Sequence, residues 1–494
     1  MKTSAQTLIE LSACEMAEGI RAREFSSLEL IDAHLAQIDR INPILNAYVQ
    51  LRADEARDEA KRADGAVVAR NVLGPLHGVP VSIKSCIDVA GTRCESGSRL
   101  RKGNVPSADA TLVARLKAAG AIVLGVTNTP EFLMAWETDN ALYGRTNNPW
   151  DLSRTAGGSS GGESAAIASF MSAAGVGSDG GGSIRVPAHY TGICGLKPTP
   201  GRVPTSGHYP PGEGAVSWLG TVGPMARTVG DLQTLFRVMA GEDLADAESA
   251  PVPLVEIEAS ELEHTHVGLM VEDPAHPVTA ETRAAVEAAA TVLSDAGLVV
   301  EPFHPPLLDR AHKLWVDAFV KMIALSSQSM VRGNEAELSP IFRDYLEYAA
   351  SFPPLTAEEI LASLAERDIV RTHSLKQTER CPILLMPVAP GPAFRHGEIG
   401  WLQAKHSATF VDAFAYTQWF NLLGCPAAAV PMTQSEEGLP IGVQIVGHPF
   451  KDELVLAVAK LVESHSCLNV ADSSRLTTKI LQHHSGIRSA EQGR

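Results

Sequence analysis

The chain has 494 residues, of which 45% are hydrophobic and 20% are charged, a composition typical of a folded globular protein. Its formal net charge is −16, and an acidic chain repels both phosphate backbones and anionic lipids, so nucleic acids and membranes are not expected as partners. Its seven scattered cysteines contain no C-x-x-C pair, which argues against a disulfide framework or a zinc site and favours a reducing, cytoplasmic location.

The N-terminal part of the chain is expected to begin with helices and to continue as alternating strands and helices. Ser26 and Glu29 have the spacing of a capping box, and the helix that follows is expected to end at Pro43. Short apolar runs at 79–83 and 121–126 predict buried strands, with a helical stretch between them. This alternation is typical of an α/β fold.

A segment crowded with glycine and serine, residues 155–202, is not a low-complexity linker, because apolar and charged residues interrupt its glycines in a non-repeating order. Its uncharged part, 164–178, is shorter than the roughly 20 apolar residues that a membrane-spanning helix needs. Residues 305–375 are expected to be helical, and residues 476–494 are expected to form a polar tail. Late strands are expected at residues 384–388, 427–431 and 442–446.

A run of three glycines followed by a serine is the first candidate for chemistry. Gly180, Gly181 and Gly182 leave their backbone N–H groups unobstructed by side chains, and N–H groups that converge on one point are what an oxyanion hole needs. Ser183 follows directly and is placed to attack the same carbonyl. A lone pattern of this kind more often forms a tight turn, so other features must support it.

Two other segments supply a base for this serine. Lys84 closes an apolar strand, where a lysine is usually a surface residue with its stem on apolar groups. If it is buried instead, desolvation lowers its pKa and it can act as a neutral base, which a serine nucleophile requires. The second segment is a further glycine–serine cluster at 157–162, which contains Ser159.

Together these segments resemble the amidase signature family. The resemblance covers nearly the whole chain, from about residue 5 to 470, and its motifs are long and occur in the family's order. They are Lys84 and the segments 157–162, 177–188, 195–199, 223–228 and 438–444.

The resemblance implies a proton relay without a cofactor. Neutral Lys84 would draw the proton of Ser159, which in this family follows a cis peptide bond, and Ser159 would draw the proton of Ser183. Ser183 would attack the carbonyl, the relay would return a proton to the leaving amine, and water would then hydrolyse the acyl-enzyme. The chain departs from many family members at Ser85 and Cys86, where an acidic or amide residue often follows the lysine.

The resemblance also implies how the nucleophile loop is built. The N–H groups of residues 180–183 would hold the oxyanion, and Asp179 and Arg185 would fix this glycine-rich loop as a charged pair. The implied fold is one α/β domain over residues 1–475, with a central twisted mixed sheet surrounded by helices. Its signature core would cover about 73–232, and the helical segment at about 305–375 would line the substrate site.

The expected reaction is hydrolysis of the carbon–nitrogen acyl bond of an amide or carbamate, with esters as easier side substrates. Candidate pocket walls are the aromatic residues Trp136, Tyr143, Tyr209 and Trp218 and the helical region 314–330, although each aromatic side chain is equally suited to the core. Bulky or aromatic acyl or amine groups are therefore the expected substrates.

The alternative is the glutamine-hydrolysing subunit of a tRNA amidotransferase, which shares the signature. Such subunits typically carry a Ser-x-Asp-Gln stretch before the Gly-Pro motif, and the corresponding segment 216–224 lacks the Asp-Gln pair. This difference favours a larger, more apolar substrate. A non-catalytic binding protein is disfavoured because all three reactive residues are present. The expected partner is a small amide, carbamate or ester, and the expected state is a monomer or homodimer.

Overall fold

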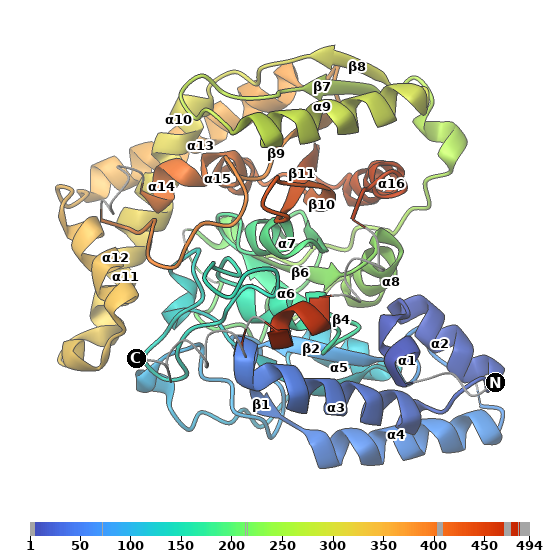
Figure 1. Ribbon diagram of the computed structural model, residues 1–494. Helices are drawn as coiled ribbons and strands as arrows, with labels where there is room; N and C mark the ends of the chain where they lie inside the picture. The colour runs from blue at the N-terminus through green and yellow to red at the C-terminus, as the bar shows by residue number, and fades with distance from the viewer. Residues whose placement is uncertain are drawn as a thin grey trace.

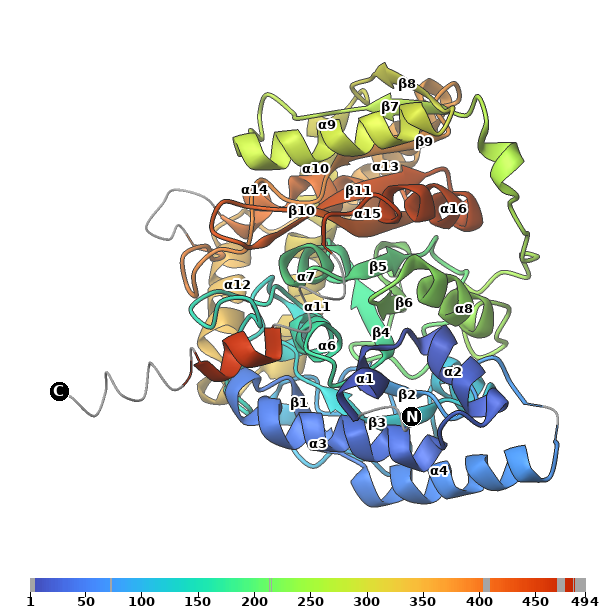
Figure 2. The ribbon, with the colours of Figure 1, turned by 45° about the vertical axis from the view of Figure 1, so that its right-hand side comes forward.

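The computed structural model describes residues 5–71, 73–212, 214, 216–402, 409–468, 476–482 and 484. Within this part of the chain, eleven strands form one mixed sheet that extends from one end of the molecule to the other (Figures 1 and 2). The strands are β1 (Tyr48–Leu51), β2 (Pro80–Lys84), β3 (Ile122–Thr127), β4 (Ala174–Asp179), β5 (Cys194–Lys197), β6 (Thr221–Ala226), β7 (His266–Leu269), β8 (Val299–Pro302), β9 (Ile383–Pro387), β10 (Ala427–Gln434) and β11 (Pro440–Gly447). Their order across the sheet is β1-β3-β2-β4-β6-β5-β10-β11-β9-β7-β8.

Helices surround this sheet, as the sequence predicts for a single α/β domain. The α-helices are α1 (Ala5–Glu10), α2 (Ala13–Ala22), α3 (Ser27–Leu45), α4 (Ala53–Val68), α5 (Thr111–Ala118), α6 (Gly161–Ala168), α7 (Arg185–Thr191), α8 (Val229–Met239), α9 (Ala280–Asp295), α10 (Leu308–Trp315), α11 (Ile323–Val331), α12 (Pro340–Ala350), α13 (Ala357–Gln377), α14 (Phe410–Ala413), α15 (Ala415–Leu422) and α16 (Asp452–Glu463). A π-helical segment, Val316–Met322, joins α10 to α11. Within the described residues, no helix is both long and apolar enough to cross a bilayer.

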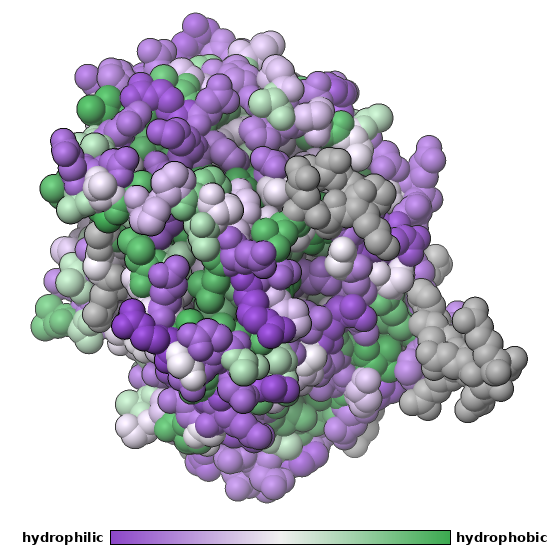
Figure 3. Space-filling view, turned by 90° about the vertical axis from the view of Figure 1, so that its left-hand side faces the viewer, coloured by the Kyte–Doolittle hydropathy of each residue, from purple (hydrophilic) through white to green (hydrophobic). Residues whose placement is uncertain are grey.

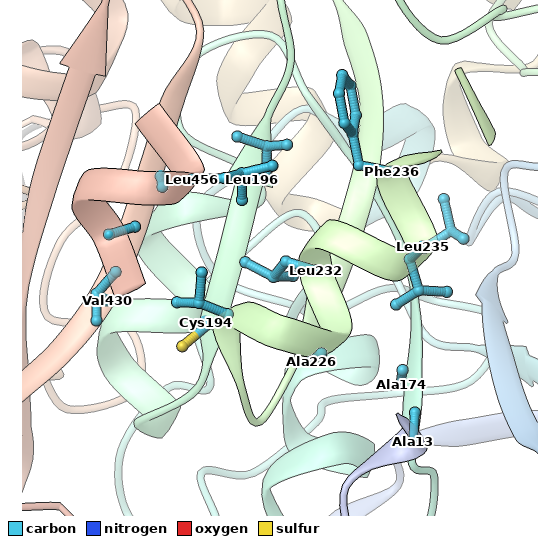
Figure 4. Close-up of a cluster of buried hydrophobic side chains, with 14 of the residues drawn as sticks. Ala13, Ala174, Cys194, Leu196, Ala226, Leu232, Leu235, Phe236, Val430 and Leu456 are labelled. Atoms are coloured by element: carbon cyan, nitrogen blue, oxygen red, sulfur yellow. The ribbon is translucent and has the colours of Figure 1, made fainter. Parts of the chain in front are cut away.

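Alternate residues of the central strands bury themselves in different helix layers, because successive side chains of a strand point to opposite faces. On β10, Ala428 and Val430 belong to the cluster that packs against α8 and α16, and Figure 4 shows Val430 in this cluster with Leu232 of α8 and Leu456 of α16. Ala427 and Ala429 point to the other face of the sheet and belong to the cluster that packs against α7 and α15. The central strands are therefore nearly continuous apolar runs, as expected for strands covered on both faces.

Parallel pairing brings the candidate residues to one edge of the sheet. β2 pairs in parallel with both β3 and β4, so the carboxyl ends of these three strands lie together. Lys84 is the last residue of β2, and β4 ends at Asp179, directly before the glycine loop. The loop then passes into α7, and α6 begins two residues after Ser159.

Two predicted boundaries are wrong. The helix expected to end at Pro43 continues to Leu45, since the missing N–H of proline removes only one hydrogen bond of the last turn. Asn46, in the left-handed conformation, closes this helix with its N–H on Asn42 O at 2.7 Å. The predicted tail begins too early, because the side chains of Leu476 and Ile480 are buried in the cluster that packs on α3. The predicted tail residues 485–494 lie outside the described residues.

Candidate active site

Lys84 is buried completely and points toward two serines. Its Nζ donates to Ser159 Oγ at 2.7 Å and to Ser178 Oγ at 3.0 Å. Burial lowers the pKa of Lys84 to about 8, against the opposing charges of Cys86, Asp179 and other acidic groups nearby. With this pKa the amine is neutral in roughly a tenth of the molecules at pH 7, and in these it can accept a proton.

The backbone around Ser159 is fixed by a cis peptide bond and by two hydrogen bonds. The peptide bond between Gly158 and Ser159 is cis, as the resemblance implies. Ser159 O accepts a hydrogen bond from Thr129 Oγ1 at 2.8 Å, and the N–H of the next residue, Ser160, donates to Ser183 O at 3.1 Å. This last bond links the two serine-bearing segments directly.

Indole and hydroxyl donors fix the peptide groups of the nucleophile loop. Trp315 Nε1 donates to Gly180 O at 3.0 Å. Trp136 Nε1 and Thr417 Oγ1 donate to Gly181 O at 3.0 Å and 2.8 Å. Since the C=O and N–H of one peptide unit point in opposite directions, anchoring these carbonyls turns the N–H groups of the following residues the other way.

One loop N–H is already engaged. The N–H of Gly182 donates to Asp179 Oδ1 at 2.7 Å, so this group must exchange that bond before it can bind an oxyanion. Gly182 has a φ of 114°, which favours glycine over any residue with a side chain. The N–H groups at 180, 181 and 183 remain as the other candidate donors of this loop.

The predicted charged pair, Asp179 and Arg185, joins the two ends of the nucleophile loop. Arg185 contacts Asp179 through two hydrogen bonds, from Nε to Oδ2 at 3.0 Å and from Nη2 to Oδ1 at 2.9 Å, and neither side chain is exposed. Asn421 Nδ2 also donates to Asp179 Oδ1, and Arg185 Nη1 donates to Gln444 Oε1. Although burial opposes it, the Arg185 guanidinium holds the pKa of Asp179 well below its usual range.

A cavity of about 600 Å³ leads to the two serines, because both Ser159 and Ser183 line it. Ser183 keeps 8% of its surface exposed, whereas Ser159 keeps 1%, so a substrate meets Ser183 first. Among the described residues that line the cavity, the titratable ones are Asp179, which is paired, and His208. The large apolar side chains of its wall are Phe132, Leu133, Met134, Leu219, Phe319, Ile323 and Met330.

The helical region predicted as a pocket wall contributes to it. The cavity is lined by Phe319 of the π-helical segment, by Ile323, Ser326 and Ser327 of α11, and by Met330. Figure 3 views the side of the molecule that carries α11 and α12 in Figure 1, where hydrophobic side chains reach the surface among hydrophilic ones.

The four aromatic residues predicted as pocket walls are not among the described lining residues. Trp136 is 2% exposed and lies in an aromatic cluster, where it stacks on Phe414 and anchors the nucleophile loop. Tyr143 lies in a turn that Asn140 caps, with its N–H on Asn140 Oδ1 at 2.7 Å.

The other two lie behind residues that do line the cavity. Tyr209 donates to Met330 Sδ at 2.9 Å and is covered by Arg101, while its neighbours at 208 and 210 line the cavity. Trp218 is covered by the guanidinium of Arg367, between lining residues 217 and 219. For Tyr209 and Trp218 the prediction therefore identified the right segments but not the side chains that form the surface.

Two residues that the sequence reasoning did not single out lie at the relay, one in contact with Lys84 and one beside its strand. Ser178 accepts a hydrogen bond from Lys84, and Glu163 is a fully buried carboxylate in the first turn of α6. A signal for Glu163 existed, since it is the one acidic residue between 152 and 178 in a segment of small and apolar residues. A lone charge in such a setting is buried only with a partner.

Comparisons with known proteins identify the family of the chain. The family model described as Amidase matches residues 29–456. Human fatty-acid amide hydrolase 2 is 31% identical over 481 residues, which cover 93% of this chain and 89% of that protein. A glutamyl-tRNA(Gln) amidotransferase subunit of Synechococcus sp. (strain CC9605) is 34% identical over 473 residues, 90% of this chain and 94% of that protein.

The fold of this chain is also similar to that of a solved structure. The crystal structure of a bacterial aryl acylamidase of the amidase signature family superposes with a TM-score of 0.82 at 25% identity, and covers 94% of this chain and 98% of that one. Sequence and structure lead to one conclusion: the chain belongs to the amidase signature family.

Proposed function

We propose that this chain hydrolyses neutral amides or carbamates with bulky apolar or aryl groups, through an acyl-enzyme on Ser183, and cleaves esters as side substrates. The observation that carries the proposal is the cavity: it leads to Ser183, has a largely apolar wall, and presents one paired carboxylate and one histidine as its described titratable groups. A charged substrate would leave its charge without a partner there.

The reaction would proceed through the three buried groups. Neutral Lys84 accepts the proton of Ser159, and Ser159 accepts the proton of Ser183, whose Oγ bonds to the substrate carbonyl carbon. The developing oxyanion is held by N–H groups of the loop, and the ion pair between Asp179 and Arg185, at the two ends of the loop, fixes the loop in place.

The second half of the reaction uses the same groups in reverse. Ser159 returns a proton to the nitrogen of the leaving amine, so that the carbon–nitrogen bond breaks with a neutral leaving group. Water then enters, gives its proton to the relay, and attacks the acyl-enzyme. The carboxylic acid leaves, or a carbonic acid half-ester if the substrate is a carbamate, and the relay returns a proton to Ser183 Oγ.

Two similar proteins support this substrate class, because one is named for fatty-acid amides and the other for aryl acyl amides. The similar amidotransferase subunits support the alternative, hydrolysis of glutamine for a partner protein. Glutamine carries an ammonium and a carboxylate that need charged partners, whereas the titratable residues described in the cavity wall are Asp179, which is paired with Arg185, and His208. The apolar substrate is therefore our preferred proposal.

The test is a substrate panel on the full chain. Anilides, aliphatic primary amides, aryl carbamates, p-nitrophenyl esters and L-glutamine are each assayed with the wild type, with Ser183→Ala and with Ser326→Ala, a matched change of a serine in the wall of the same cavity. We expect turnover of anilides or carbamates that Ser183→Ala abolishes and Ser326→Ala retains. Strong turnover of glutamine, or of small aliphatic amides alone, would overturn the substrate class.

A further inference from the structure

Glu163 is a buried carboxylate that the proposed reaction does not use. None of its surface is exposed. Its Oε1 accepts a hydrogen bond from Ser82 Oγ, and its Oε2 accepts one from Thr127 Oγ1 at 2.6 Å. Gly175 of β4 leaves room for it, since a Cβ atom at that position would overlap Glu163 Oε1. Helix α6 and strands β2, β3 and β4 therefore all meet at this carboxylate.

The two hydroxyls that hold Glu163 belong to immediate neighbours of Lys84. Ser82 is two residues earlier on β2, so its side chain leaves the sheet on the same face as that of Lys84. Thr127 is the residue of β3 that pairs with Lys84 in the parallel register. The carboxylate is thus fixed beside the part of the Lys84 side chain that is closest to the backbone, and the charges of Glu163 and Lys84 act on each other.

Other titratable groups face Lys84 from the remaining elements. Asp179, at the end of β4, already has an arginine in its buried ion pair. After β2, Cys86 faces His208, which lowers the pKa of this thiol although burial raises it. Burial raises the pKa of Glu163 to about 7, and Lys84 is the cation that opposes the rise. Hydrogen bonds from Ser82 and Thr127 oppose the rise more strongly than Lys84 does, and Lys84 is the cation that acts with them on the charge of Glu163.

We propose that Glu163 is a positioning residue that keeps Lys84 basic enough to take the proton of Ser159. The inference rests on the proposed role of Lys84 as the base. Complete burial alone favours the neutral amine, and an amine that holds a proton too weakly cannot draw one from a hydroxyl. A carboxylate fixed beside Lys84 stabilises the ammonium that forms when the proton arrives.

The test measures the protonation of Lys84 without any assumption about the substrate. Ser183 is labelled with phenylmethanesulfonyl fluoride, and the labelling rate is followed by intact mass as a function of pH, with Ser183→Ala as the control for the labelled site. Glu163→Gln keeps the shape and removes the charge. Glu131→Gln is the matched control, because Glu131 is 1% exposed and also accepts from two serine hydroxyls, Ser98 Oγ at 2.6 Å and Ser339 Oγ at 2.7 Å.

We expect Glu163→Gln to lower the pH of half-maximal labelling by about half a pH unit or more, a roughly threefold change in the acid constant, and to lower the plateau rate about tenfold. Glu131→Gln should keep the wild-type midpoint even if it lowers stability. A Glu163→Gln protein that folds and retains the wild-type midpoint would overturn the proposal, because a purely structural role would change the rate and not the midpoint.

A second variant decides the question if Glu163→Gln does not fold. Thr127→Val removes one donor from the ionised carboxylate with little change of shape, so the midpoint should fall in the same direction by a smaller amount. An unchanged or raised midpoint would overturn the proposal. The proposed function fails separately, if the wild type is labelled at Ser183 but hydrolyses no member of the amide panel.

Discussion

Lys84 Nζ lies 2.7 Å from Ser159 Oγ, although the two residues belong to different elements of the fold. Lys84 ends a strand of the sheet, and Ser159 lies in the loop that leads into α6. Both side chains are buried, so the hydroxyl has this amine as its base, and bulk water does not compete for it. The protonation state of one amine therefore controls whether Ser183 can be activated.

The first prediction concerns pH. Lys84 acts as a base only when it is neutral, and burial lowers its pKa to about 8, so kcat/KM for an amide should rise with pH and level off above about 8. Below that value it should fall about tenfold per pH unit, because the ammonium cannot accept a proton. Initial rates at low substrate concentration, measured between about pH 6 and 10, give this profile. A midpoint near 6.5 would instead indicate a histidine with an ordinary pKa.

The second prediction concerns the ion pair beneath the nucleophile loop. Asp179→Asn removes one charge from a pair with no exposed surface and leaves the Arg185 guanidinium unpaired, which should lower the free energy of unfolding by about 3–5 kcal/mol. Glu366→Gln is the control, because it breaks the half-exposed pair with Arg310 and should cost at most about 1 kcal/mol. Urea unfolding followed by circular dichroism compares the two variants. If both variants lose the same free energy of unfolding, the buried pair does not stabilise the loop more than an exposed ion pair would.

Much of the core of the site could be predicted from the sequence, because its residues are next to one another in the chain. The run from Asp179 to Arg185 contains the loop, the nucleophile and the charged pair. The burial of Lys84 did not follow from its strand, because a lysine that closes an apolar strand is usually a surface residue. The fold class, in contrast, followed from alternating strands and helices. The strand order did not, because nothing local indicates that β5 lies between β6 and β10.

The cavity wall was harder to predict for a physical reason. A large aromatic side chain is stable both in a core and in a pocket, and the sequence does not distinguish these settings. Trp136 and Trp315 are both buried and hold loop carbonyls with their indole N–H groups, whereas Phe319, one turn after Trp315, lines the cavity. Only the packing of α10 and the π-helical segment against the loop determines which ring faces the substrate.

The third prediction concerns the apolar wall. Ile323 lines the cavity and is only partly buried, so Ile323→Ala should fold normally but remove apolar contact with a bulky substrate. We expect KM for a bulky anilide to rise about tenfold, with a smaller effect on a short aliphatic amide. Ile369→Ala is the control, because Ile369 is 50% exposed on α13 and does not line the cavity. An equal rise of KM for both amides would argue against apolar recognition by this wall.

The fourth prediction separates support of the loop from packing. Trp136→Phe keeps an aromatic ring in the cluster but removes one of the two donors to Gly181 O. The peptide between Gly181 and Gly182, whose N–H donates to Asp179, then loses an anchor, and the glycine loop is held less firmly in its shape. We expect kcat to fall on the order of tenfold while KM changes little, since the loop binds charge that develops in the transition state. Trp150→Phe is the matched control: its buried indole donates to Thr191 O at 2.8 Å, at the far end of α7. Both variants should lose similar stability in thermal unfolding, and only the first should lose kcat. If kcat falls equally in both, the loss comes from packing and the indole is not an anchor of the loop.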